Sequence, residues 1–442
     1  MAVITRESTV GTLLRFATAG SVDDGKSTLV GRLLHDSKSI LADQLEAVTR
    51  TSTERGFGGT DGGIDFALLT DGLRAEREQG ITIDVAYRYF ATAQRSFILA
   101  DCPGHVQYTR NMVTGATTAD AVVMLIDARK GVLEQTRRHL SVVHQLRVPH
   151  VIIAVNKIDL LDYSERAFDL VADAVRAVTA QLGLDEVHVL PTSALLGDNI
   201  VDRSPNMPWY DGPSLLELLE TLPSTDDLES GEEDFRMPVQ LVIRPQGALA
   251  SGIDDPDAFR DYRAYGGQIS SGRISVGDRV TVSHTGSSTV VTGIDFAGSE
   301  LTTAAAPQSV ALRLRDDFDI ARGATIAAEG TLPEPAKNVT ASLFWLDDRA
   351  LLPGARVLVK FGTATIQAVV LEITGRRNLD TLELEPADRL DVNDIGQARV
   401  RLSAALPVEL FAHNRRGGAF LIINPSDGAT LAAGTILERN DE

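Results

Sequence analysis

One run of eight residues near the N-terminus restricts this chain to a narrow class of folds. The strand-like stretch LLRFATA and the helical stretch TLVGRLLHDSKSI enclose the sequence Gly20-Ser21-Val22-Asp23-Asp24-Gly25-Lys26-Ser27. A phosphate chain is bound by backbone N–H groups at a helix N-terminus, by glycines that let the backbone approach, by a lysine, and by a hydroxyl group that reaches Mg²⁺. Lys26 and Ser27 supply the last two groups. The pattern therefore predicts a phosphate-binding loop rather than a chance glycine-rich turn.

The chain around this loop reads as an α/β domain over residues 1–222. Helical stretches such as 162–182 alternate with short apolar runs at 97–100, 121–126 and 151–155. Such alternation is typical of a doubly wound, mainly parallel sheet with helices on both faces. We expect a P-loop domain of this architecture.

The second half of the chain has a different pattern. Residues 223–236 are acidic and almost free of large apolar side chains, which predicts a solvated linker. Beyond them, strand-like runs follow one another without helices between them, as in β-barrels or sandwiches. Pro333 and Pro335 mark a plausible boundary. The expected fold class is α/β followed by β, with two β-barrel domains at 237–332 and 333–442.

The composition indicates in which compartment the protein works and which kinds of partner it is not expected to bind. The chain has 442 residues, of which 43% are hydrophobic, and no apolar run approaches the roughly 20 residues that a membrane span needs. The N-terminal sequence lacks the pattern of a secretion signal, and one cysteine cannot form an internal disulfide, so a cytoplasmic protein is expected. With 42 Lys and Arg against 61 Asp and Glu, the net charge is -19, and neither a nucleic-acid partner nor a membrane is expected.

A second motif indicates which base accompanies the phosphates. Asn156-Lys157-Ile158-Asp159 comes directly after the buried strand-like run VIIAV. A carboxylate at Asp159 can accept hydrogen bonds from N1–H and the amino group of guanine, whereas adenine presents the wrong pattern. The stem of Lys157 can cover the base, and Asn156 can tie this loop to the phosphate loop. Alone, four such residues would be an ordinary loop. Together with the phosphate loop and Ser193-Ala194-Leu195, which follows another strand, they indicate guanine.

Two further segments have the chemistry to sense a third phosphate. Asp101-Cys102-Pro103-Gly104 follows the apolar run FILA, so Asp101 can reach Mg²⁺ through water and the Gly104 N–H can meet the γ-phosphate. Residues 80–83 place the hydroxyl group of Thr82 where it can bind the same metal. His105 comes next after Gly104, where its side chain can orient the attacking water. Loss of the third phosphate would release both segments.

Other polar candidates are interpreted as structural. His139 and His144 lie on an expected helix at a spacing that does not suit a shared metal. Cys102 could be a redox sensor, but a packed loop residue is the favoured interpretation when nothing indicates a lowered pKa.

The order of these motifs, followed by two β domains, resembles that of translational GTPases of the elongation factor type over nearly the whole chain. Narrower stretches look like the large, GTP-binding subunit of sulfate adenylyltransferase. These stretches are residues 71–90, FRDYRAYGGQISSGRISVGD, WLDDRALLPGARVLVKFGT and NRRGGAFLIINPSDGATLAAGTI.

This resemblance implies GTP or GDP and Mg²⁺ as ligands. In the family pattern, His105 positions water, Lys26 and Thr82 act on the phosphates, and Ser27, Thr82 and, through water, Asp101 hold the metal. The residues expected to line the nucleotide site are Gly20, Ser21, Val22, Asp23, Asp24, Gly25, Lys26, Ser27, Thr28, Asp101, Cys102, Pro103, Gly104, His105, Asn156, Lys157, Ile158, Asp159, Ser193, Ala194 and Leu195.

The resemblance also implies a partner, in a heterodimer or a higher assembly. A smaller catalytic subunit would make adenylyl sulfate and pyrophosphate from ATP and sulfate, an uphill reaction that GTP hydrolysis by this chain would drive. Only one phosphate-loop pattern is found, so a fused adenylyl-sulfate kinase is not expected.

Two other functions are weighed against this one. They are an elongation factor that delivers aminoacyl-tRNA and a scaffold protein that uses GTP only structurally. Ser21 and Asp24 stand where elongation factors usually carry histidines, which favours the sulfate branch.

Overall fold

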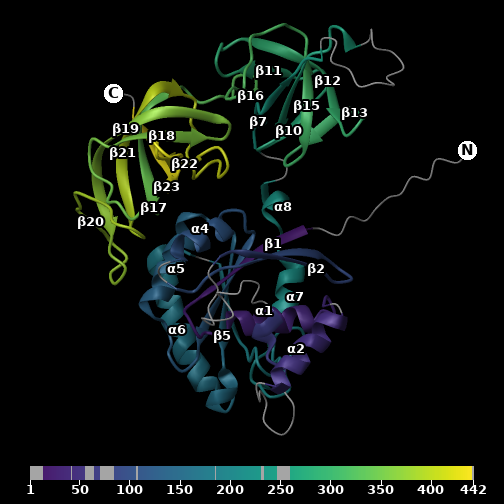
Figure 1. Ribbon diagram of the computed structural model, residues 1–442, viewed down its shortest axis with the longest axis vertical. Coiled ribbons are helices and arrows are strands. Elements are labelled where there is room, and N and C mark those ends of the chain that lie inside the picture. The colour runs from purple at the N-terminus through teal and green to yellow at the C-terminus, as the bar shows by residue number, and fades with distance from the viewer. Residues whose placement is uncertain are drawn as a thin grey trace, which may run out of the picture. The chain divides into compact units, whose positions relative to one another are not determined.

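The computed structural model describes residues 13–40, 42–54, 64–69, 84–105, 108–184, 186–229, 233–245 and 259–440. The chain divides into two compact units (Figure 1). The first contains Met1–Thr225 and Asn378–Glu383, and the second contains Asp226–Arg377 and Leu384–Glu442. Within the described ranges, no helix is long and apolar enough to cross a membrane.

The first unit is built on a six-stranded sheet, as the alternation of apolar runs predicts. The strands follow the order β2-β3-β1-β4-β5-β6, in which β2 runs antiparallel to β3 and the other neighbours are parallel. Their bounds are β1 (Leu13–Gly20), β2 (Ala86–Ala91), β3 (Ser96–Asp101), β4 (Ala121–Asp127), β5 (His150–Asn156) and β6 (Val187–Pro191). The predicted doubly wound, mainly parallel sheet is confirmed.

Helices cover both faces of this sheet. In Figure 1, α1, α2 and α7 lie on one side of it, and α4, α5 and α6 lie on the other. Their bounds are α1 (Lys26–Asp36), α2 (Ala42–Glu54), α4 (Thr109–Thr117), α5 (Glu134–Gln145), α6 (Glu165–Leu182) and α7 (Leu215–Thr221), with the short 3₁₀ helices η2 (Phe66–Leu69) and η4 (Ile158–Leu161).

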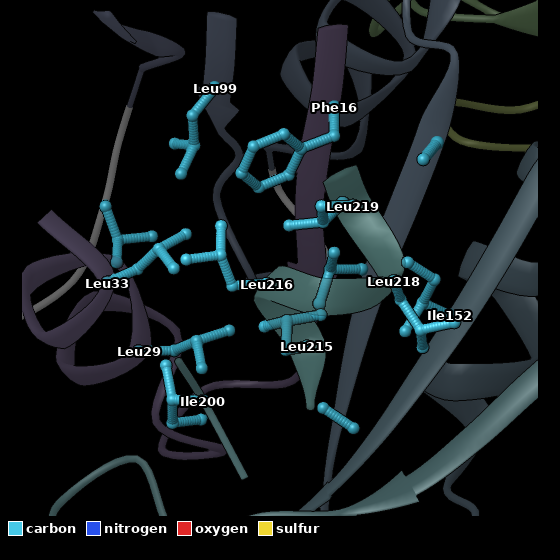
Figure 2. Close-up of a cluster of buried hydrophobic side chains, with 14 of the residues drawn as sticks. Phe16, Leu29, Leu33, Leu99, Ile152, Ile200, Leu215, Leu216, Leu218 and Leu219 are labelled. Carbon is cyan, nitrogen blue, oxygen red and sulfur yellow. The ribbon is translucent and has the colours of Figure 1, made fainter. Parts of the chain in front are cut away.

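The apolar residues of the central strands explain this layering. Every residue of β4 and β5 is buried, as expected for parallel strands covered on both faces. Figure 2 shows the core on one face, where Leu29 and Leu33 of α1 and Leu215 and Leu216 of α7 converge near Phe16 of β1. This packing fixes β1 and α1, and therefore both ends of the phosphate loop.

The second unit contains two main sheets and one two-stranded ribbon. The first main sheet has the path β7-β16-β11-β12-β15-β9-β8, with β13 paired to β12. Its strands are β7 (Arg236–Pro238), β8 (Leu241–Ile243), β9 (Ala264–Gln268), β11 (Arg279–Val282), β12 (Ser288–Phe296), β13 (Ser299–Leu301), β15 (Ser309–Leu314) and β16 (Thr325–Ala328). The ribbon pairs β10 (Arg273–Ser275) with β14 (Thr303–Ala305).

The second main sheet closes into a barrel. Its path is β18-β22-β23-β17-β21-β19-β20, and a further pairing of β18 with β19 joins the two sides. Closure removes exposed strand edges, which would otherwise pair with other chains. The strands are β17 (Ala336–Trp345), β18 (Arg356–Phe361), β19 (Ala364–Arg377), β20 (Leu384–Glu385), β21 (Ile395–Leu406), β22 (Ala419–Ile423) and β23 (Thr430–Asn440).

Described residues at both ends of the acidic segment 223–236 are built into the fold. The segment contains the short helix α8 (Thr225–Glu229), and Ser224, Phe235 and Arg236 are buried. One cause is the carboxylate of Asp120, which accepts a hydrogen bond from the Thr225 N–H at 2.9 Å. The acidic composition did not reveal these anchors because they depend on residues distant in the sequence.

Candidate functional site

The phosphate loop lies between the end of β1 and the start of α1. Gly25 precedes α1 with a left-handed backbone (φ 95°), and no side chain caps the helix. The first N–H groups of α1 are therefore left for a ligand, because side-chain caps normally satisfy them. A Cβ atom at Gly25 would lie 2.5 Å from Asn156 Nδ2. Glycine is thus required here both for the backbone angle and for the close approach of the second loop.

Lys26 is buried in this loop. Its Nζ donates hydrogen bonds to the carbonyl oxygens of Gly20 at 3.0 Å and Ser21 at 2.8 Å. Burial lowers the pKa of Lys26, and the nearby carboxylates of Asp101 and Asp24 oppose that shift. A buried ammonium group bonded to carbonyls is a preformed centre of positive charge that suits phosphate oxygens.

Two polar atoms of the loop are left unsatisfied. Asp24 Oδ2 accepts a hydrogen bond from the Ser21 N–H at 2.7 Å. Asp24 Oδ1 and Ser21 Oγ, although buried, have no hydrogen-bond partner in the part of the chain that the structure describes. Unpaired buried polar atoms are costly, so they mark a place where a ligand or water supplies the missing bonds.

The segment after β3 lies against the same loop. Asp101 ends β3 opposite Thr18 of β1, whose hydroxyl group donates to Asp101 Oδ1 at 2.9 Å. A Cβ atom at Gly104 would collide with Lys26 Nζ and would lie 2.6 Å from Gly20 O. The backbone at Gly104 therefore approaches the phosphate loop closely, as a γ-phosphate contact requires.

The residues around Gly104 have different environments. Cys102 is fully buried, and burial raises the pKa of its thiol, which fits the interpretation as a packed loop residue. His105 is half-buried, and its ring centre lies 6.0 Å from that of Tyr108. Thr82 lies outside the described residues.

Asn156 joins three loops, and the prediction that it ties its own loop to the phosphate loop is confirmed. It ends β5, and its Nδ2 donates to Asp24 O at 2.8 Å. Its Oδ1 accepts from the Ala194 N–H at 2.9 Å and from the Thr192 hydroxyl group at 3.5 Å. The side chain is 1% exposed, so these bonds hold the loops without competition from water.

Asp159 carries a buried carboxylate oxygen in this second loop. Its Oδ1 is buried and has no hydrogen-bond partner among the residues that the structure describes. Ile158, the preceding residue, is fully buried and anchors the start of η4. A carboxylate oxygen held in this way can accept N–H donors from a base.

The loop after β6 supplies backbone rather than side chains. Ser193 and Ala194 are buried, and the N–H groups of Asp198 and Ser193 exchange hydrogen bonds with each other's carbonyls at 3.1 Å. Arg32 Nε of α1 donates to Ala194 O at 3.3 Å. Leu195 points outward, with 45% of its surface exposed.

Three residues at this site escaped the sequence motifs. Asp127 follows the buried strand β4 as Asn156 follows β5, and the two residues are paired in register. Ligands of such sheets bind at the carboxyl ends of the parallel strands, so the position of Asp127 after an apolar strand is the sequence signal for it. Arg129 and Arg32, which contact Asp127 and Ala194, carry no signal of their own because surface arginines are common on helices and turns.

Two stretches of the chain match known protein families. Residues 12–225 match the family described as the elongation factor Tu GTP binding domain. Residues 338–437 match the GTP-eEF1A C-terminal domain-like family. These matches agree with an α/β nucleotide domain followed by β domains.

Curated relatives cover nearly the whole chain. The bifunctional enzyme CysN/CysC of Xylella fastidiosa is 46% identical over 98% of this chain, which spans 66% of that relative. Sulfate adenylyltransferase subunit 1 of Sulfurovum sp. is 44% identical over 96% of this chain and 87% of the relative. The protein of the same name from Saccharophagus degradans is 43% identical over 97% of this chain and 88% of the relative. The chain thus spans about two thirds of the length of the bifunctional relative.

Proposed function

Because the chain belongs to the family of sulfate adenylyltransferase subunit 1, within the GTP-binding proteins of elongation factor Tu type, we propose that it is the GTP-hydrolysing subunit of a sulfate adenylyltransferase. Its GTP hydrolysis drives a smaller catalytic subunit, which joins ATP and sulfate into adenylyl sulfate and pyrophosphate. This reaction is the first step of sulfate assimilation.

The observation that carries the guanine assignment is the unpaired buried oxygen of Asp159. The N1–H and amino group of guanine would satisfy the carboxylate, and adenine has no matching pair of donors. The loop that holds Asp159 is tied to the phosphate loop by Asn156 Nδ2 and Asp24 O. A single nucleotide could therefore contact the Asp159 loop with its base and the phosphate loop with its phosphates.

The phosphate side supports a nucleotide triphosphate with Mg²⁺. Lys26 would hold the outer phosphates, and the Gly104 N–H would donate to the γ-phosphate. The hydroxyl group of Ser27 and, through water, the carboxylate of Asp101 are oxygen ligands of the kind that Mg²⁺ prefers. Thr82 is assigned to the metal on the sequence alone. Mg²⁺, when bound, neutralises charge on the phosphate oxygens.

Hydrolysis requires a water molecule in line with the γ-phosphate. His105 follows Gly104, whose backbone lies beside Lys26, so its imidazole is the side chain assigned to orient that water. Lys26 stabilises the charge that spreads over the phosphate oxygens in the transition state.

The loop also bears on the choice between the sulfate and translation branches. Ser21 and Asp24, the two positions that differ from elongation factors, are joined by the hydrogen bond from the Ser21 N–H to Asp24 Oδ2. The donor is a backbone N–H group, so this bond depends on the carboxylate of Asp24 and not on the side chain of Ser21. Asp24, one of the two departures from the elongation-factor pattern, therefore has a structural role in the phosphate loop.

The test is to measure two products at once. Phosphate from GTP and pyrophosphate from ATP are followed while the catalytic subunit is titrated into this chain, with and without sulfate. We expect slow GTP hydrolysis by the isolated chain, faster hydrolysis with partner, ATP and sulfate, and an adenylyl sulfate yield that rises with GTP turnover. His105→Ala is the matched control, because it should bind GTP while losing both the acceleration and the yield.

Two results together would contradict the proposal. One is GTP hydrolysis that is indifferent to partner, ATP and sulfate in every combination. The other is an equal final yield with a non-hydrolysable GTP analogue.

A further inference from the structure

A buried carboxylate lies beside the proposed base-binding loop and belongs to none of the sequence motifs. The side chain of Asp127, the last residue of β4, is fully buried. Asp127 pairs in register with Asn156, and the next N–H group, of Ala128, donates to Asn156 O at 2.8 Å. The carboxylate is thus fixed at the root of the loop that carries Asp159.

Two cations bind this carboxylate. Arg129 Nε donates to Oδ1 at 2.9 Å, and Arg129 Nη2 donates to Oδ2 at 2.6 Å. Lys157 Nζ lies 3.2 Å from the same Oδ2. Burial alone would raise the pKa of Asp127, but the hydrogen bonds from Arg129 and Lys157 outweigh burial and lower it. The group is therefore an anion at neutral pH.

Arg129 gives each oxygen of Asp127 one side-chain hydrogen bond, and Lys157 adds a second cation beside Oδ2. Lys157 Nζ also donates to Asp23 O in the phosphate loop. Lys157 Cε lies 3.9 Å from the position that a Cβ atom at Gly25 would occupy. The lysine stem therefore runs across the phosphate loop, with its ammonium group held by one acceptor on each side.

A lysine stem is flexible, and ordering it on ligand binding costs conformational entropy. Here the stem is ordered in advance. We propose that Asp127 is a positioning residue for the nucleotide, because it holds Lys157 extended where the stem covers the base and joins the two loops. This inference rests on the proposed guanine-nucleotide site. The pair differs from an ordinary surface ion pair because the side chain of Asp127 is fully buried.

The test measures release of a fluorescent GDP analogue from the full chain. Asp127→Asn keeps the shape of the side chain and removes its charge, so we expect release about tenfold faster. The preference for GTP over xanthosine triphosphate should not change, because Asp159 is intact. The matched control is Asp173→Asn, which removes a carboxylate paired to Arg176 at 2.8 Å on α6 and should release GDP at the wild-type rate.

A double variant separates positioning from general destabilisation. Lys157→Met keeps an apolar stem and removes the ammonium group, so adding Asp127→Asn to it should change release less than about twofold. The inference is overturned if Asp127→Asn releases GDP at the wild-type rate, or if it accelerates release equally with and without Lys157. If Asp127→Asn does not fold, Lys157→Met alone must release GDP about tenfold faster, and an unchanged rate overturns the inference. Failure of the wild-type chain to bind GDP would instead contradict the proposed function.

Discussion

Asp159 has a buried carboxylate oxygen with no hydrogen-bond partner among the described residues, and a substitution can change its hydrogen-bonding chemistry. Asp159→Asn replaces a charged acceptor by an amide, which should weaken GTP binding by about 1.5–3 kcal/mol. Xanthine carries an oxo group where guanine carries its amino group, so the new amide N–H regains a partner. Competition between GTP and xanthosine triphosphate measures the expected switch. An unchanged preference would mean that this loop does not read the base.

The role of a single residue can be predicted from the sequence when the residue belongs to a motif of consecutive residues. The motif predicts that Asn156 ties its loop to the phosphate loop, and the structure has that hydrogen bond. The sequence motifs do not single out Asp127, although it contacts Lys157 of the same motif. Its contact depends on the alignment of β4 with β5, which residue order alone does not give.

At the level of elements, α5 carries a buried histidine, His139, that makes the stability of the fold depend on pH. His139 is fully buried, and burial, with smaller contributions from Lys26 and Arg138, lowers its pKa from 6.5 to about 3. Its Nε2 lies 2.7 Å from Gln135 Nε2, and its Nδ1 has no hydrogen-bond partner in the described ranges. The packed position of this helix therefore favours the neutral form of the imidazole.

The sign of the pH effect follows from that pKa. Between about pH 3 and pH 6.5 the unfolded chain binds a proton at this histidine and the folded chain does not. Stability therefore falls as the pH falls below 6.5, by about 1.4 kcal/mol per pH unit. His139→Leu should flatten this slope and leave the curve above neutral pH parallel to that of the wild type.

Urea unfolding at several pH values, followed by far-ultraviolet circular dichroism, checks this expectation. The signal reports mainly on the first unit, which contains α1, α2, α4, α5, α6 and α7. Equal slopes for the two proteins would show that His139 does not set the acid sensitivity of α5.

At the level of the whole molecule, the sequence predicts the kinds of layers but not how all the strands pair. The parallel sheet follows from alternating strands and helices, since a crossover connection leaves little choice of topology. In the second unit, β17 pairs with both β21 and β23, and β18 closes onto β19. Several orders of such strands bury the same apolar faces, so the pattern of side chains could not choose among them.

The proposed coupling also has a thermodynamic consequence for the complete chain. If GTP and GDP favour different states, and the catalytic subunit prefers one of them, the two binding events must be linked. One ratio compares how tightly the partner binds the GTP-bound and the GDP-bound chain. The other compares the preference of the chain for GTP over GDP with and without the partner. Linkage requires these two ratios to be equal. This equality holds whatever surface the partner uses.

We expect both ratios to be equal and at least about fivefold, the lower end of typical coupling between sites. Calorimetric titration of the catalytic subunit into the chain, loaded with GDP or with a non-hydrolysable GTP analogue, gives the first ratio. Competition between the two nucleotides with and without saturating partner gives the second. The matched control is Asp159→Asn loaded with the corresponding xanthine nucleotides, which should preserve the ratios because the phosphate contacts are unchanged. Two ratios of one would mean that the partner does not distinguish the nucleotide states, and GTP hydrolysis would then have no binding difference through which to drive the partner's reaction.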